Sequence, residues 1–175
     1  MKVALCSGSF DPITNGHLDI IERAAQIFDK VLVTVFHNLE KRTLFTMEER
    51  VDMIRKVTGH LENVEVDCFE GLLCDYARRK GAKVLVRGLR AISDFEYEFQ
   101  IAQINKKLNP DLETMFMMTR TEHSYLSSSI VKEIASLGGC VRELVPPYVA
   151  DRLREKFAKK RREGERDEGP PATTG

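Results

Sequence analysis

The 175-residue sequence predicts an α/β fold: a single Rossmann-like domain in which helices cover both faces of a five-stranded parallel sheet. Two observations support this prediction. Apolar runs with the length of strands alternate along the chain with segments of helical periodicity. A glycine-containing loop, residues 8–17, joins the first strand to the first helix. Because the first strand of such a sheet starts at its centre, we expect the strand order 3-2-1-4-5, with ligands bound beyond the carboxyl ends of the strands.

Five segments have the composition of strands. Residues 30–36 are rich in β-branched apolar side chains, which is typical of a strand that is buried on both faces. Residues 64–69 alternate between apolar and polar side chains. The complete set of predicted strands is 3–6, 30–36, 64–69, 82–86 and 114–118.

The predicted helices have recognisable ends. Thr46 and Glu49 have capping-box spacing, Gly81 closes the third helix, and Pro110 follows the fourth. The first helix is predicted to begin near residue 16. The other predicted helices span residues 46–57, 72–79, 92–108, 127–137 and 147–162. Residues 163–175 contain almost no apolar side chains. We therefore predict one domain over residues 1–162 and a charged, disordered tail over 163–175.

The composition excludes several classes of protein. The formal net charge is zero, with 27 basic and 27 acidic residues, so we expect no nucleic-acid partner. The N-terminus enters a strand at once, and the sequence has neither a signal peptide nor an apolar run that could span a bilayer. Cys6, Cys68, Cys74 and Cys140 lack the spacing of a metal site. We expect buried, reduced thiols in a cytoplasmic protein without a membrane partner.

The loop over residues 8–17 has the features of a phosphate-binding site. The first backbone N–H groups of a helix are unpaired, and the helix dipole favours an anion beside them. His17 adds a side-chain donor in the first helical turn. Neither G-x-G-x-x-G nor a P-loop motif is present, whereas residues 14–17 match the T-x-G-H motif of nucleotidyltransferases. The charge of His17 stays open, because the dipole disfavours its protonation and bound phosphates favour it.

Further phosphate-binding residues follow the other predicted strands. Arg87 and Arg90 flank Gly88 after the fourth strand, and the arginine fork suits phosphate oxygens. Lys41 follows the second strand, and a run of serines, 127–129, stands at a predicted helix start. Leu73, after the third strand, offers an apolar contact or a core side chain.

Four motifs together resemble the bacterial phosphopantetheine adenylyltransferases, over roughly residues 1–160. They are residues 8–17, residues 87–90, residues 94–98 and residues 126–132. The resemblance implies an adenylyltransferase of coenzyme A biosynthesis that converts ATP and 4′-phosphopantetheine to dephospho-coenzyme A and pyrophosphate. It also implies a requirement for Mg²⁺, without metal ligands from the chain, and assembly into a homohexamer.

The resemblance assigns roles to individual residues. His17 would bind ATP and stabilise the transition state at the α-phosphate. The other ATP-binding residues would be Ser9, Phe10, Gly88, Leu89, Arg90, Glu98, His123, Ser124, Tyr125, Leu126, Ser127, Ser128 and Ser129. The residues that hold 4′-phosphopantetheine would be Ser9, Lys41, Leu73 and Arg87.

Two other functions fit the same motifs. The first is a nucleotidyltransferase with another acceptor, such as nicotinate mononucleotide or glycerol phosphate. A nucleotide acceptor would favour an aromatic stacking residue, whereas Lys41, Leu73 and Arg87 suit a phosphate on a partly apolar arm. The second is a non-catalytic nucleotide-binding module, for which we would expect a broken motif.

Overall fold

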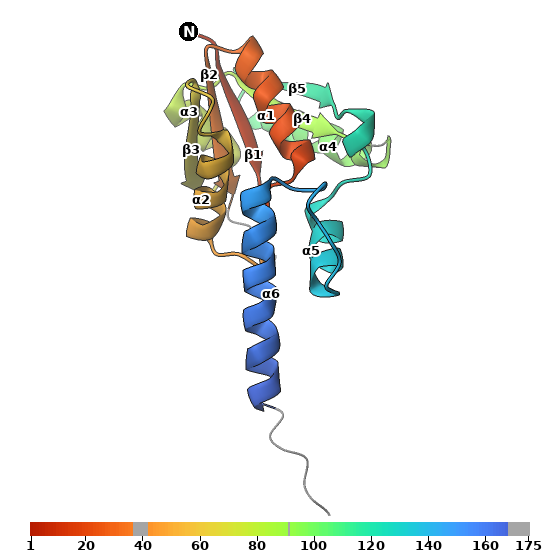
Figure 1. Ribbon diagram of the computed structural model, residues 1–175. Coiled ribbons are helices and arrows are strands. Elements are labelled where there is room, and N and C mark those ends of the chain that lie inside the picture. The colour runs from red at the N-terminus through yellow and green to blue at the C-terminus, as the bar shows by residue number, and fades with distance from the viewer. Residues whose placement is uncertain (37–41, 91, 168–175) are drawn as a thin grey trace, which may run out of the picture.

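The computed structural model describes residues 1–36, 42–90 and 92–167, and it contains the predicted parallel sheet (Figure 1). The five strands have the order β3-β2-β1-β4-β5 and all pairs between neighbours are parallel. This confirms the predicted fold class and strand order. The strands are β1 (Val3–Gly8), β2 (Lys30–Phe36), β3 (Val64–Phe69), β4 (Val84–Leu89) and β5 (Glu113–Met118).

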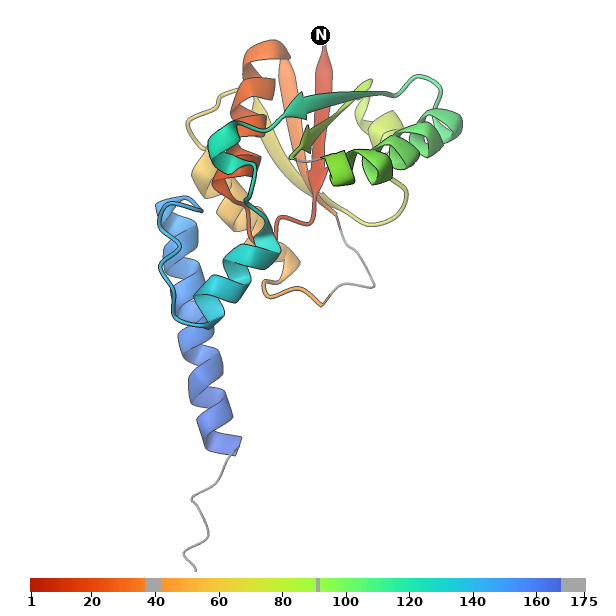
Figure 2. The same cartoon turned by 90° about the vertical axis from the view of Figure 1, so that its right-hand side faces the viewer.

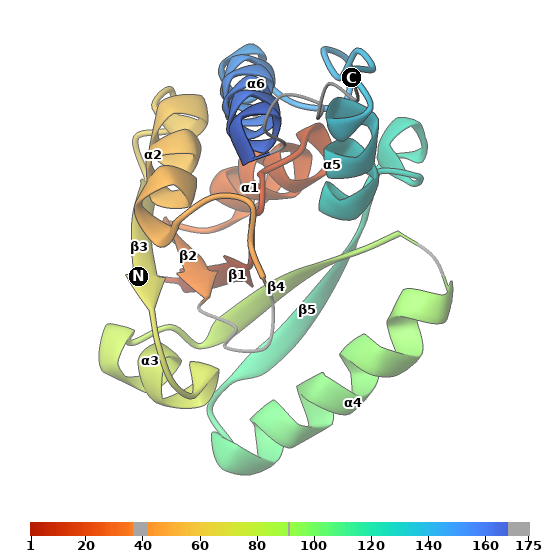
Figure 3. The ribbon, with the colours of Figure 1, turned by 90° about the horizontal axis from the view of Figure 1, so that it is seen from below.

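Helices cover both faces of the sheet (Figure 3). They are α1 (Asn15–Ile27), α2 (Met47–Thr58), α3 (Leu73–Lys80), α4 (Ile92–Leu108), α5 (Ser128–Ser136) and α6 (Pro147–Asp167), with a short 3₁₀ turn, η1 (Thr121–His123). Seen from the carboxyl ends of the strands, α1, α2, α5 and α6 lie on one side of the sheet and α3 and α4 lie on the other.

The alternation of side chains along β1 divides the core into two clusters. Ala4 and Cys6 belong to the larger cluster, which α1, α2, α5 and α6 cover. Val3 and Leu5 belong to the smaller cluster, which includes side chains of α3. Because both faces of the central strands are buried, β1 and β2 carry almost no exposed side chains, as a parallel sheet requires.

Three elements extend two or more residues further than the sequence predicts. β1 continues to Gly8, which pairs with Val35. β4 continues to Leu89 because its last three residues pair with residues 116–118 of β5, so Arg87 and Gly88 are strand residues and do not follow the strand. α6 continues to Asp167, five residues past its predicted end. The division into a domain and a tail stays a prediction.

The thiols differ from the prediction. Within the described residues all four cysteines are free, but only Cys6 and Cys74 are buried. The prediction of buried thiols is wrong for Cys68, which lies on the edge strand β3, and for Cys140, which lies between α5 and α6. None of the helices in the described part of the chain is long and apolar enough to cross a membrane.

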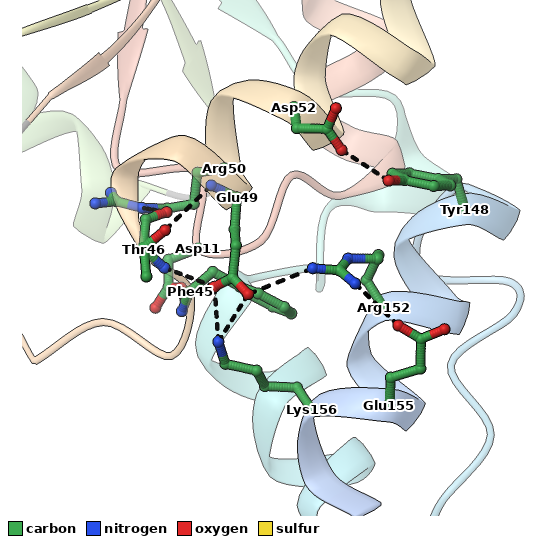
Figure 4. A network of polar contacts seen from close by, with 10 residues as sticks. All are labelled: Asp11, Phe45, Thr46, Glu49, Arg50, Asp52, Tyr148, Arg152, Glu155 and Lys156. Atoms are coloured by element: carbon green, nitrogen blue, oxygen red, sulfur yellow. Dashed lines mark hydrogen bonds and ion pairs between the residues drawn. The ribbon is translucent and has the colours of Figure 1, made fainter. Parts of the chain in front are cut away.

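Helix α6 points away from the sheet (Figures 1 and 2) and is tied to α2 by a polar network (Figure 4). The Glu49 carboxylate accepts from Lys156 at 2.7 and 2.9 Å and from Arg152 at 3.3 Å. The same carboxylate closes the capping box of α2 by accepting from the backbone N–H of Thr46 at 2.8 Å. One side chain therefore connects the start of α2 to the middle of α6.

Candidate active site

A cavity of about 730 Å³ lies where β1 and β4 end. It brings together residues from the 8–17 loop, from β4, from α4 and from the segment between β5 and α5. The predicted site residues that line it are Ser9, Phe10, His17, Arg87, Gly88, Arg90, Glu98, His123, Leu126, Ser127, Ser128 and Ser129. This is the crevice between β1 and β4 that the strand order predicts.

Five predicted site residues are not among those that line the cavity. Lys41 lies outside the described residues. Leu73 begins α3 and packs against the smaller core cluster. Leu89 is buried, whereas the Tyr125 side chain is exposed. Ser124 follows η1, where its hydroxyl donates to the Thr121 carbonyl. Their contacts with a substrate stay predictions.

The loop before α1 is held in one shape by local contacts. Phe10 has a positive φ of 46°, which is uncommon for a residue with a side chain. Thr14 is the N-cap residue of α1, and its hydroxyl accepts from the backbone N–H of His17 at 3.4 Å. The backbone N–H of Asn15 donates to the Leu144 carbonyl. The loop is thereby fixed to the chain just before α6.

His17 is neutral and has a defined tautomer. The backbone N–H of Thr14 donates to Nδ1 of His17 at 3.0 Å, so Nδ1 is the acceptor and Nε2 carries the proton. Burial, together with the positive charges of Arg90 and Arg87, lowers the pKa of His17 from 6.5 to about 4. At neutral pH the ring of the free protein therefore offers one N–H donor and carries no charge.

Two arginines connect the walls of the cavity: Arg87 lies in β4 and Arg90 directly follows it. Arg87 forms a two-point ion pair with Glu98 of α4 and donates to the Ser7 carbonyl at 2.6 Å. Arg90 donates to the Leu126 carbonyl at 2.6 Å. β4 is therefore bonded to β1, to α4 and to the segment before α5.

Sequence reasoning missed an ion pair in the cavity wall. Asp11 is 4% exposed, and its carboxylate accepts from Lys132 at 2.7 Å and from the backbone N–H groups of Leu44 and Phe45 at 2.9 Å. A signal for Lys132 was present, because it lies four residues after Ser128 and hence on the same face of α5. Arg42, Thr43, Tyr97 and Thr119 also line the cavity. Tyr97 belongs to the 94–98 motif, but no role was predicted for any of the four.

The described side chains around the cavity do not form a metal site. The two carboxylates that line the cavity, Asp11 and Glu98, are both engaged by cationic side chains. Among the residues that the structure describes, no group of three His, Cys, Asp or Glu side chains could hold a metal ion.

Comparison with known proteins agrees with this architecture. The cytidylyltransferase-like family model matches residues 5–134. A solved structure from Vibrio parahaemolyticus, provisionally named a nicotinate-nucleotide adenylyltransferase, superposes with a TM-score of 0.68 over 91% of this chain and 97% of that one. Its sequence identity is 18%, so it shows the fold alone.

Curated relatives are much more similar in sequence. The phosphopantetheine adenylyltransferase of Caldanaerobacter subterraneus subsp. tengcongensis is 56% identical over 91% of this chain and 99% of its own length. That of Carboxydothermus hydrogenoformans is 57% identical over 91% and 98%. A family model that covers most of the domain and relatives at this identity lead to one conclusion: the chain belongs to the cytidylyltransferase-like family and, within it, to the phosphopantetheine adenylyltransferases.

Proposed function

We propose that this cavity transfers the adenylyl group of ATP to 4′-phosphopantetheine, which gives dephospho-coenzyme A and pyrophosphate. The observation that supports this most strongly is the convergence of His17, Arg87 and Arg90 on one cavity in a chain of this family. The cavity offers hydrogen-bond donors from α1, from β4 and from the start of α5, and positive charge from Arg87 and Arg90. Such a set of groups suits two polyanions that must be held together.

The reaction needs no protein nucleophile. An oxygen of the acceptor's phosphate attacks the α-phosphorus of ATP, and the bond from that phosphorus to the pyrophosphate oxygen breaks. The attacking phosphate is already an anion at neutral pH, so no general base has to remove a proton. Negative charge accumulates on the oxygens around the α-phosphorus in the transition state, and donors aimed at those oxygens lower the barrier.

His17 is the donor that we place at the α-phosphate. Its neutral ring donates from Nε2 because Nδ1 is occupied by the Thr14 N–H. A neutral donor adds no fixed charge that would hold the pyrophosphate product in the site. The ring of Phe10 packs edge-on against the imidazole, with 5.2 Å between the centroids, and helps to hold its orientation.

The start of α5 suits the triphosphate of ATP. Ser127 caps this helix by accepting from the Ile130 N–H. Ser128 and Ser129 have a hydroxyl and a backbone N–H group each in its first turn. Arg90 reaches this segment through the Leu126 carbonyl. We place the acceptor on the other side, with its phosphate on Arg87 and Lys41 and with Ser9 between the two substrates.

Mg²⁺ enters this proposal as part of the substrate. Mg²⁺ in nucleotide sites is commonly held by phosphate oxygens and water together with one or two carboxylates. Because Asp11 and Glu98, the carboxylates that line the cavity in the described part of the chain, are both ion-paired, we propose that the ion arrives as the complex with ATP.

Self-association into a homohexamer is also a proposal. Apolar side chains of α4 and β5 are exposed in the single chain, among them Phe99, Ile104 and Met118, and burial between copies would remove them from water. A cytoplasmic location stays a prediction.

The test is a pyrophosphate-release assay with ATP, Mg²⁺ and one acceptor at a time. We expect rapid release with 4′-phosphopantetheine and very little with nicotinate mononucleotide or glycerol 3-phosphate. Faster turnover with either of the other acceptors would overturn the assignment of the substrate. Binding of ATP without turnover of any acceptor would instead indicate a non-catalytic module.

A further inference from the structure

The Arg87–Glu98 pair uses most of the hydrogen-bonding capacity of both side chains. Nε of Arg87 donates to Oε2 of Glu98 at 2.7 Å, and Nη2 donates to Oε1 at 2.6 Å. Nη1 donates to the Ser7 carbonyl at 2.6 Å. The guanidinium is thus held along one edge by a carboxylate and at a third nitrogen by the backbone of β1, which fixes its plane.

Both side chains are largely withdrawn from water while they line the cavity. The exposed fraction is 27% for the Arg87 side chain and 13% for that of Glu98. A charge-assisted, two-point pair at this depth is stronger than an exposed ion pair. Because each oxygen of Glu98 already accepts from Arg87, this carboxylate is committed to the arginine before any substrate binds.

An arginine held in this way keeps donors for a second anion. The guanidinium has five N–H groups, and the contacts with Glu98 and Ser7 use three of them. One N–H on Nη1 and one on Nη2 remain as donors for a phosphate oxygen. We propose that Glu98 is a positioning residue for the acceptor: it holds the Arg87 guanidinium so that its remaining donors meet the phosphate of 4′-phosphopantetheine. This inference rests on the proposed function for the identity of that acceptor.

The proposal separates Glu98 from the nucleotide, to which the family resemblance assigns it. A residue that contacts ATP directly would affect ATP binding whether or not Arg87 is present. A residue that acts through Arg87 would affect the acceptor alone, and only while the arginine is there. The two roles therefore differ in which substrate responds and in whether Arg87 is needed.

Replacement of Glu98 by Gln removes the pairing at nearly constant size. The amide oxygen of Gln can accept from one of the two facing N–H groups, but its own N–H₂ group opposes the other. The guanidinium then regains rotamer freedom that it must lose again when it binds the phosphate, and this loss weakens binding of the acceptor. Loss of the negative charge acts in the opposite direction, but it would strengthen the binding of both substrate anions.

The experiment measures each substrate separately in four proteins: the wild type, Glu98→Gln, Arg87→Ala and the double variant. Titration calorimetry gives the Kd of 4′-phosphopantetheine, and steady-state pyrophosphate release gives the KM of ATP. We expect Glu98→Gln to raise the acceptor Kd about fivefold and to leave the ATP KM within twofold of the wild type. In the Arg87→Ala background, Glu98→Gln should have no further effect on the acceptor.

Glu96→Gln is the matched control, because Glu96 is exposed on the same helix and does not line the cavity. It should change neither constant. If Glu98→Gln does not fold, Glu98→Asp keeps the charge one methylene short of the guanidinium and should weaken acceptor binding in the same selective way.

Every other result counts against the positioning role. A raised ATP KM with an unchanged acceptor Kd would make Glu98 a nucleotide contact. Tighter binding of both substrates would make it a repulsive charge. Failure of the proposed function is a separate outcome, since the wild type would then not release pyrophosphate with this acceptor at all.

Discussion

The N–H of Thr14 and Nδ1 of His17 are 3.0 Å apart, and this contact determines which nitrogen of the ring carries the proton. The two residues stand three positions apart at the start of α1, where the Thr14 hydroxyl also accepts from the His17 N–H. The T-x-G-H spacing therefore has a structural reason besides phosphate binding. It forms a capping box in which histidine occupies the position usually held by Glu or Gln, and it fixes the histidine as a donor through Nε2.

Replacement of His17 by Ala removes this donor. We expect kcat to fall by about 10²–10³, as when a donor to a transition-state oxyanion is lost, with much smaller changes in the KM of either substrate. Steady-state kinetics with both substrates varied would measure this. A covalent phosphoramidate on His17, trapped with ATP alone, would contradict the donor role and favour a two-step reaction.

The low pKa of His17 predicts how stability depends on pH. The pKa lies at about 4 in the folded chain and near 6.5 in the unfolded one, so the unfolded chain binds the proton more readily. The resulting contribution to stability is complete above pH 6.5 and decreases as the pH falls from 6.5 toward 4. Its upper bound is about 3 kcal/mol, at 1.36 kcal/mol per pKa unit.

Urea unfolding at pH 7.5 and pH 4.5 would measure this loss. The matched variant is His17→Asn, whose amide oxygen can still accept from the Thr14 N–H but does not titrate. We expect the wild type to lose more stability than the variant between the two pH values. Equal losses would mean that His17 does not titrate in this range.

The sequence predicts this fold well because each signal is local. The β-branched run at residues 30–36, the capping box at Thr46 and the left-handed Gly81 after α3 each act within a few residues, and each lies where it was predicted. Pairing between strands is not local, which is why the predicted end of β4 at Val86 was three residues too early.

The residues of the candidate site differ in the same way: local motifs predict some of them, and the topology brings the others together. Motifs predicted that His17, Arg90 and Ser127 line the cavity, because each of them stands at the end of an element. The partners of Asp11 are 33, 34 and 121 residues away in sequence, and no spacing rule connects them. Contacts of this kind become visible only when the topology brings α5 and the segment before α2 to the end of β1.

Replacement of Asp11 by Asn tests how much the contacts of this buried carboxylate contribute to stability. The amide can accept one of the backbone N–H groups, but it leaves the other donors without a charged partner. We expect a loss of about 2–3 kcal/mol of unfolding free energy, because hydrogen bonds to a charged, buried group are among the stronger ones. Denaturant unfolding would measure the loss, with Asp151→Asn as the control in an exposed ion pair. Similar losses in the two variants would show that the Asp11 contacts contribute little.

The attachment of α6 depends on Glu49, which receives Lys156 and Arg152 while it caps α2 (Figure 4). Glu49→Gln removes the charge that both cations share, while the Gln amide oxygen can still accept from the Thr46 N–H. We expect a loss of about 1 kcal/mol, from two partly exposed ion pairs worth less than 1 kcal/mol each. The control is Glu155→Gln on α6, where one exposed partner of Arg152 is lost and the expected change is below about 0.5 kcal/mol.

Amide hydrogen exchange would locate the effect: in Glu49→Gln, exchange should accelerate in α6 and in the first turn of α2 and stay unchanged in β1 and β2. Uniform acceleration across the sheet would mean that Glu49 supports global stability and does not specifically attach α6.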